Sequence, residues 1–172
     1  MLIVMAGLPG TGKSTIARAL ASRLGGTALD KDVIRAALFT PADIEYSTAQ
    51  DDFVMGVVMR VAQYLLKRDS GRQILIDGRP FSRCYQLEEI LDLAEQARAS
   101  WRVLECVCSE ETARRRLALD TEAGNHPAAN RRFEMYLKTK AAAEPITFPK
   151  IVLDTDQPLD VCVALALAAI QK

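Results

Sequence analysis

The stretch that decides the fold stands at the start of the chain, LIVMA (residues 2–6) followed by GLPGTGKST (residues 7–15). An apolar run that stops at a glycine, crosses a Gly/Pro-rich turn and continues into an apolar-periodic segment over 14–24 is typical of strand, loop and helix in succession. We therefore predict a buried strand over 2–6, a tight turn after it, and a helix that begins near Lys13.

The turn has the Walker A pattern, G-x-x-x-x-G-K-[ST]. Glycines let the backbone turn so that consecutive N–H groups face one anion, and the helix N-terminus adds partial positive charge. We expect Lys13 to reach the β- and γ-phosphates of a nucleotide and Ser14 to be a ligand of the Mg²⁺ that accompanies it. The residues expected to bind the nucleotide are Gly7, Leu8, Pro9, Gly10, Thr11, Gly12, Lys13, Ser14 and Thr15.

Length and composition indicate one domain, residues 1–172, of ordinary soluble composition. No apolar run is long enough to cross a bilayer and no basic region precedes the first strand, so we expect a cytoplasmic protein. Lys plus Arg and Asp plus Glu are balanced at 22 each, which provides no general field for a polyanion, although a local basic patch stays open.

The four cysteines lack C-x-x-C spacing and the chain has one histidine, His126, so a zinc site is not expected. Cys106 and Cys108 are two residues apart in an apolar run and share one face of the predicted strand. This placement favours reduced thiols in the core over a disulfide.

A short strand over 27–29 is expected to deliver Asp30, Lys31 and Asp32 to the crevice at the carboxyl end of the sheet. Asp32 and Arg35, three residues apart on a helix, place a carboxylate and a guanidinium side by side. They could orient an acceptor hydroxyl and hold an anionic part of the acceptor, respectively. The alternative is that Asp32 caps the helix and forms an exposed ion pair with Arg35.

These two motifs, 7–15 and 29–35, resemble the P-loop kinase group of the AAA-type ATP-binding proteins, which includes adenylylsulfate kinases, polynucleotide 5'-kinases, zeta-type toxins and small-molecule phosphotransferases. Members of that group carry a D-x-D-x-x-R or related D-x-x-R segment after the second strand. The resemblance implies that Asp32 is the catalytic carboxylate on the acceptor side and that Arg35 anchors the substrate. It also implies ATP as the phosphate donor.

A polar segment over 41–50 precedes a long helix whose apolar residues are expected to face the core. They are Phe53, Val54, Met55, Val57, Val58, Met59, Val61 and Leu65. A buried strand over 74–76 then ends at Asp77, which could hold Mg²⁺ through a water molecule, as in a Walker B element, or could cap the next turn. Arg79 and Arg83 follow as candidate anion binders in the acceptor loop, the alternative being ion pairs with Glu88 or Glu89.

Three consecutive arginines lie on a helix that Ser109 is expected to cap, and only one or two of them can face the phosphates. The resemblance favours Arg116 of the three. It also places a lid at about 120–132, which would exclude water and bring Arg131 to the transferring phosphate. A solvated helix N-terminus is the alternative for Arg131.

A fifth strand over 151–154 leads into a closing helix, with Asp156 as its expected cap and Pro158 in its first turn. Strands that alternate with helices predict a three-layer α/β P-loop NTPase domain, with helices on both faces of a parallel sheet. The resemblance implies the strand order 2-3-1-4-5 for its five strands.

The expected function is Mg²⁺-dependent transfer of the ATP γ-phosphate to a hydroxyl of a small-molecule or nucleotide-like acceptor, whose identity the sequence does not give. Lys13, Asp32, Arg116 and Arg131 are the expected catalytic residues. Two alternatives stay open. One is a polynucleotide 5'-hydroxyl kinase, which the balanced charge disfavours; the other is an ATP-hydrolysing switch or nucleotide-dependent binding module.

Overall fold

The computed structural model describes residues 1–123 and 132–171, apart from the side chains of 122 and 123. Within them the chain forms one parallel sheet of five strands in the order β2-β3-β1-β4-β5, which confirms the predicted architecture. The strands are β1 (Leu2–Ala6), β2 (Thr27–Asp30), β3 (Ile74–Asp77), β4 (Trp101–Val107) and β5 (Ile151–Asp154). The helices are α1 (Lys13–Leu24), α2 (Lys31–Leu38), η1 (Pro41–Asp43), α3 (Thr48–Arg68), α4 (Cys84–Gln96), α5 (Glu110–Ala123), α6 (Phe133–Ala142) and α7 (Leu159–Ile170).

The central strand β1 is buried on both faces, and successive residues serve the two cores in turn because strand side chains alternate. Leu2, Val4 and Ala6 pack with residues of α3 and α4. Ile3 and Met5 pack on the opposite face with residues of α1 and α7. The sheet therefore lies between two helical layers, as predicted.

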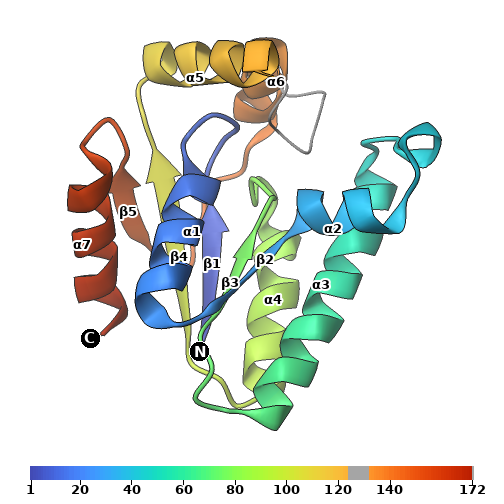
Figure 1. Cartoon of the computed structure of the whole chain (residues 1–172), viewed down its shortest axis with the longest axis vertical. Helices are drawn as coiled ribbons and strands as arrows, with labels where there is room; N and C mark the ends of the chain where they lie inside the picture. Colours follow the sequence, from blue (N-terminus) through green and yellow to red (C-terminus); the bar gives the residue numbers. More distant parts are fainter. Residues whose placement is uncertain (124–131, 172) are drawn as a thin grey trace.

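Helices α5 and α6 form a further layer, which lies across the carboxyl ends of the strands (Figure 1). Their own small core consists of Ala113, Leu117 and Tyr136, with Leu8 of the turn after β1 packed against it. This contact places α5 directly over the glycine-rich turn. Helices α5 and α6 therefore cover the crevice at the carboxyl edge of the sheet.

The face that α3 turns to the core is the predicted one in part: Val54, Met55 and Val58 are buried as expected, and Met59 and Leu65 are partly buried against the same core. Leu66 is also buried on that face, whereas Phe53 is 60% exposed and contacts Phe39 edge-on. Two neighbouring rows of this helix carry apolar residues at four-residue spacing, 53/57/61/65 and 54/58/62/66. Helical periodicity alone fits both rows, and packing against the sheet selects the second.

The cap that was the alternative role for Asp32 and the cap expected at Asp156 are both wrong. Strand β2 extends to Asp30, and α2 begins directly after it at Lys31, two residues earlier than a cap at Asp32 would place its start. The Asp30 carboxylate accepts the N–H groups of Asp32 (2.8 Å) and Val33 (3.3 Å). At α7, the capping position belongs to Pro158, while Asp156 accepts from the N–H of Ser109 (2.8 Å) at the start of α5. Asp32 is consequently not used as a cap.

The four cysteines are free thiols, as predicted for Cys106 and Cys108, but Cys108 follows the end of β4 and is half-buried rather than a core residue. Cys106 is fully buried in β4, and burial raises the pKa of its thiol to about 12. None of the described helices is long and apolar enough to pass through a membrane.

Candidate active site

The turn between β1 and α1 adopts the conformation that its glycines allow. Gly10 and Gly12 both have φ of +79°, and Gly12 is the N-cap of α1. A Cβ on Gly10 would lie 2.9 Å from the carbonyl oxygen of Ala113 in α5, so only glycine permits this close approach. The backbone therefore wraps around the start of α1 as a phosphate-binding loop requires.

Lys13 is the residue around which the crevice is arranged. It is 6% exposed, and its Nζ donates to the carbonyl oxygen of Leu8 at 2.9 Å, which holds the side chain back across the loop. Two cavities meet at this residue, and Lys13 and Ser14 line both. One is about 300 Å³ and the other about 700 Å³.

The smaller cavity lies between the glycine-rich loop, α5 and the loop after β5. It is lined by Gly10, Gly12, Lys13, Ser14, Thr15, Ile16, Arg18, Arg116, Asp120, Thr155, Gln157, Leu159 and Cys162. The Arg116 guanidinium donates to the hydroxyl (3.1 Å) and carbonyl (2.7 Å) oxygens of Thr155. The Thr155 hydroxyl in turn donates to the carbonyl of Thr11 at 2.8 Å, so three segments of the chain are joined here.

Of the three consecutive arginines, the structure brings Arg116 to the loop. Arg114 instead stacks on the ring of Phe133, 4.0 Å from its centroid, and Arg115 is exposed. Arg116 was the sequence preference, and its position fits that preference. Arg131, His126 and most of the predicted lid lie outside the described residues.

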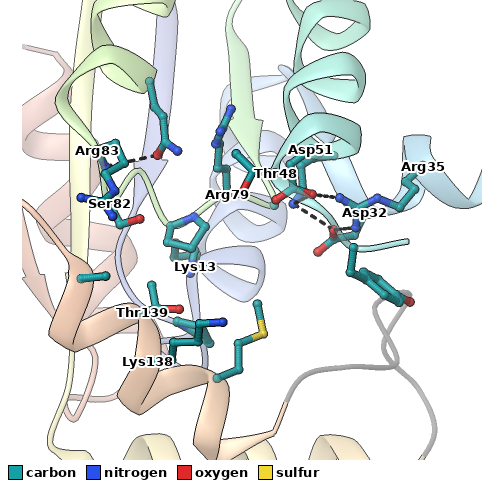
Figure 2. Close-up of a pocket in the computed structure, with 18 of the residues that line it drawn as sticks. Lys13, Asp32, Arg35, Thr48, Asp51, Arg79, Ser82, Arg83, Lys138 and Thr139 are labelled. Atoms are coloured by element: carbon teal, nitrogen blue, oxygen red, sulfur yellow. Dashed lines mark hydrogen bonds and ion pairs between the residues drawn. The ribbon is translucent and has the colours of Figure 1, made fainter. Parts of the chain in front are cut away.

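The larger cavity opens on the other side of Lys13 (Figure 2), where Ser82 and Arg83 lie to one side of the lysine and Asp32, Asp51 and Arg35 to the other. Its lining residues come from the loops after β1, β3 and η1 and from α1, α2, α3, α4 and α6. They include Pro9, Lys31, Asp32, Arg35, Tyr46, Thr48, Asp51, Arg79, Ser82, Arg83, Tyr85, Glu134, Met135, Lys138 and Thr139. The predicted acceptor residues Arg35, Arg79 and Arg83 are thus brought together around one space.

Asp32 and Arg35 form the predicted pair, at 3.0 Å, but the pair is buried rather than exposed. Arg35 also donates to Asp51, the fourth residue of α3. Lys31 completes the cluster, with its Nζ 2.9 Å from Asp51 Oδ1 and 3.4 Å from Asp32 Oδ1. Burial lowers the pKa of Lys31 to about 8, against the opposing attraction of Asp32.

Sequence reasoning placed Lys31 at the crevice without a role, and it missed Asp51. The acidic residue in the first turn of α3 was an available signal, since the capping Ser47 marks where that helix begins. The helix was instead expected to start nearer Phe53, which left Asp51 without an assigned role.

The two arginines of the acceptor loop have partners other than those predicted. Arg79 is buried and pairs with Asp52 rather than with an acidic residue of α4. Arg83 pairs at 3.1 Å with Glu144, which also accepts the N–H of Cys84 at 2.7 Å. Glu144 therefore fastens the segment after α6 to the start of α4, and helps to fix the roof of the larger cavity.

The donor set of the crevice fits a magnesium ion. Asp77 is 2% exposed at the end of β3, and its Oδ1 is buried with no hydrogen-bond partner among the described residues. It lines neither cavity itself, but the next residue, Gly78, lines the larger one. A serine hydroxyl and one carboxylate, together with nucleotide phosphates and water, are the oxygen ligands that Mg²⁺ prefers. Ser14 and Asp77 can supply the two protein oxygens of such a set.

The class of protein is defined by the fold and by this loop: a P-loop α/β protein whose sheet has the strand order of nucleotide-kinase-like folds. Solved structures share the fold at low sequence identity. The APS kinase CysC of Mycobacterium tuberculosis, in complex with AMPPNP and APS, has a TM-score of 0.74 and 19% identity, with 99% of this chain and 97% of that chain covered. Kti12 of Chaetomium thermophilum, in complex with ADP-AlF3, has a TM-score of 0.72 and 16% identity, with coverage of 99% and 97%.

A gluconokinase of Sinorhizobium meliloti 1021 also shares the fold, with a TM-score of 0.67, 15% identity and coverage of 99% and 90%. No curated protein matches the chain by sequence. The AAA domain family matches residues 2–145, and the chain belongs to this family. Family and fold agree with the resemblance seen in the two sequence motifs.

Proposed function

We propose that the protein is an ATP- and Mg²⁺-dependent kinase that transfers the γ-phosphate of ATP to a hydroxyl of a small-molecule or nucleotide-like acceptor. The observation that carries the proposal is the meeting of two cavities at Lys13 and Ser14. The phosphate-binding loop lines the smaller cavity, and the Asp32 carboxylate lines the larger one. A nucleotide in the first would point its terminal phosphate toward an acceptor in the second.

Each residue of the junction has a role in such a transfer. Lys13, once released from the carbonyl of Leu8, stabilises the charge of the β- and γ-phosphates. Ser14 and Asp77 would hold Mg²⁺, the latter through a water molecule, and the ion supplies charge neutralisation of the phosphates. Arg116 lies on the nucleotide side, where it can stabilise charge that develops on the transferring group.

Asp32 serves the acceptor. The acceptor oxygen forms a bond to the γ-phosphorus as the bond from that phosphorus to the β,γ-bridging oxygen breaks, ADP leaves, and the hydroxyl proton passes to the Asp32 carboxylate. Because the transition state of phosphoryl transfer is loose, we expect Asp32 to orient the hydroxyl more than to remove its proton early. The charge-assisted hydrogen bond from Arg35 holds the Asp32 carboxylate in place for that purpose.

The likeness to solved kinases supports this proposal, because proteins of the same fold include one bound to AMPPNP and APS and one named as a gluconokinase. We do not assign APS or the acceptor of the gluconokinase to this protein. The acceptor cavity is formed by loops and helix starts, and these are the parts of a fold that vary with substrate.

The test is a screen of metabolites and of oligonucleotides with a 5'-hydroxyl, incubated with ATP and Mg²⁺ and read out by phosphorylated product. For the acceptor found, Asp32→Asn is expected to lower kcat by about 100-fold or more, whereas Asp92→Asn, an exposed aspartate on α4, serves as the matched control. ATP hydrolysis without product, unchanged in Asp32→Asn, would identify a hydrolysing switch instead.

A further inference from the structure

The larger cavity contains two carboxylates that share the same two cations. Lys31 Nζ contacts Oδ1 of both Asp32 and Asp51, and Arg35 donates to Oδ1 of both. The two acidic side chains come from different helices, α2 and α3, and are held facing one another by the cations between them (Figure 2). All four residues line the cavity.

The charges of this cluster cancel, which determines what it can bind. Two cations face two carboxylates, and Arg35 is only 2% exposed, so its guanidinium is occupied by the protein's own carboxylates. An anionic group of a ligand would meet Asp32 and Asp51 before it met either cation. This end of the cavity is therefore unsuited to a phosphate, sulfate or carboxylate, in contrast to the role that the sequence predicted for Arg35.

What the cluster presents to the cavity is hydrogen-bond acceptors. The hydrogen bonds that Lys31 and Arg35 donate to Asp32 and Asp51 all enter Oδ1, no hydrogen bond between described residues enters either Oδ2, and the two carboxylate side chains are more exposed than the two cations. An ionised carboxylate is an acceptor only, and a hydroxyl is the neutral group that donates to it. Because both carboxylates contact one ammonium, their Oδ1 atoms lie within about two hydrogen-bond lengths of each other.

We infer that Asp51 binds a second hydroxyl of the acceptor, next to the hydroxyl that Asp32 orients for phosphorylation. The inference rests on the proposed function and narrows it. The acceptor is a polyhydroxylated compound with neighbouring hydroxyls and no charge at the end that enters the Asp32–Asp51 pair. Asp51 selects the acceptor, whereas Asp32 acts on the reacting oxygen.

The experiment compares polyols, sugars and nucleosides with analogues that lack one of two adjacent hydroxyls, each with ATP and Mg²⁺. We expect the wild-type protein to phosphorylate the diols with kcat/KM about 10- to 100-fold higher than the deoxy analogues, the cost of one lost hydrogen bond to a charged group. In Asp51→Asn this ratio should fall toward one, with the KM for ATP unchanged. Asp92→Asn is the matched control, and Asp51→Glu tests whether the charge at a shifted position restores discrimination.

The possible results separate the inference from the proposed function. Equal kcat/KM for the diols and deoxy analogues in the wild-type protein would overturn the inference and leave the kinase in place. A discrimination ratio that Asp51→Asn leaves intact would also overturn it. Phosphorylation of no compound in the panel, with ATP bound, would refute the proposed function and the inference with it. The comparison within the wild-type protein needs no variant, so a poorly folded Asp51→Asn does not decide the outcome.

Discussion

Gly78, directly after β3, offers a prediction whose size follows from the structure. Its φ is +91°, and a Cβ there would lie 2.8 Å from the backbone nitrogen of Lys31 and 3.0 Å from Asp30 Oδ1. Alanine at this position meets two costs, a strained left-handed backbone and overlap with backbone that cannot rotate away. Strain at one residue costs about 1–3 kcal/mol, and overpacking costs about 1–3 kcal/mol.

We therefore expect Gly78→Ala to lower the free energy of unfolding by about 2–6 kcal/mol, measured by urea denaturation. The matched control is Gly56→Ala. Gly56 lies inside α3, and a Cβ added there would have nothing within 4 Å, so the alanine should stabilise the protein by about 0.5–1 kcal/mol. The two variants add the same methyl group and should move the midpoint in opposite directions.

Gly78→Ala should also affect the acceptor side of the candidate active site, because the new methyl group would contact atoms at the N-terminus of α2. A displaced α2 would move Asp32 away from Lys13, so in folded Gly78→Ala we expect a raised KM for the acceptor and an unchanged KM for ATP. An unfolding midpoint equal to that of the wild type would show that α2 moves aside freely, and the close packing of Gly78 on α2 would then have no energetic consequence.

Two further predictions concern charge in the site. Lys31 faces Asp32, Arg35, Asp51 and Arg79, and because its pKa is lowered to about 8 its charge is lost as pH rises through that value. We therefore expect kcat/KM for the acceptor to fall above pH 8 in the wild type, and this fall to move to higher pH in Lys31→Arg. Identical pH profiles for the two proteins would refute the assignment. Arg116→Ala should weaken ATP binding, measured by calorimetry, by about 10-fold or more, whereas the control Arg115→Ala, at an exposed position, should leave ATP binding unchanged. Equal ATP affinities of the wild type and Arg116→Ala would show that Arg116 is not part of the nucleotide site.

The parts of the molecule that the sequence predicts well are those set by local pattern. The strand, turn and helix over 2–24 need only the apolar run, the glycines and helical periodicity, and the pairing of Asp32 with Arg35 follows from their spacing. The strand order came from the resemblance rather than from the residues, since alternating strands and helices specify a parallel sheet but leave several orders open.

The parts that could not be predicted depend on contacts between elements. Asp51 reaches Arg35 because α3 crosses α2 at its own first turn, and Glu144 reaches Arg83 across 61 residues of sequence. Each partner is an ordinary polar residue of a helix start or loop; the cap at Ser47 could have placed Asp51 in the first turn of α3, but no local pattern indicates which residue it would pair with. Ion pairs of this kind depend on how the helices pack. Hydrophobic periodicity predicts the packed face of a helix only to within one row of residues, as the two apolar rows of α3 show.

The distribution of charge in the crevice bears on the size of the acceptor. Lysine and arginine balance aspartate and glutamate over the whole chain. In the larger cavity, Arg35 and Arg79 are buried and paired with carboxylates of α3, so neither offers an unpaired charge to a polyanion. A groove for a polynucleotide needs a row of cations that face the solvent and follow the backbone of the strand. Among the described residues that line this cavity, Lys138 is an exposed cation with no ion pair. Paired charges fix geometry rather than attract polyanions, and this arrangement favours a small acceptor that is recognised by its hydroxyls.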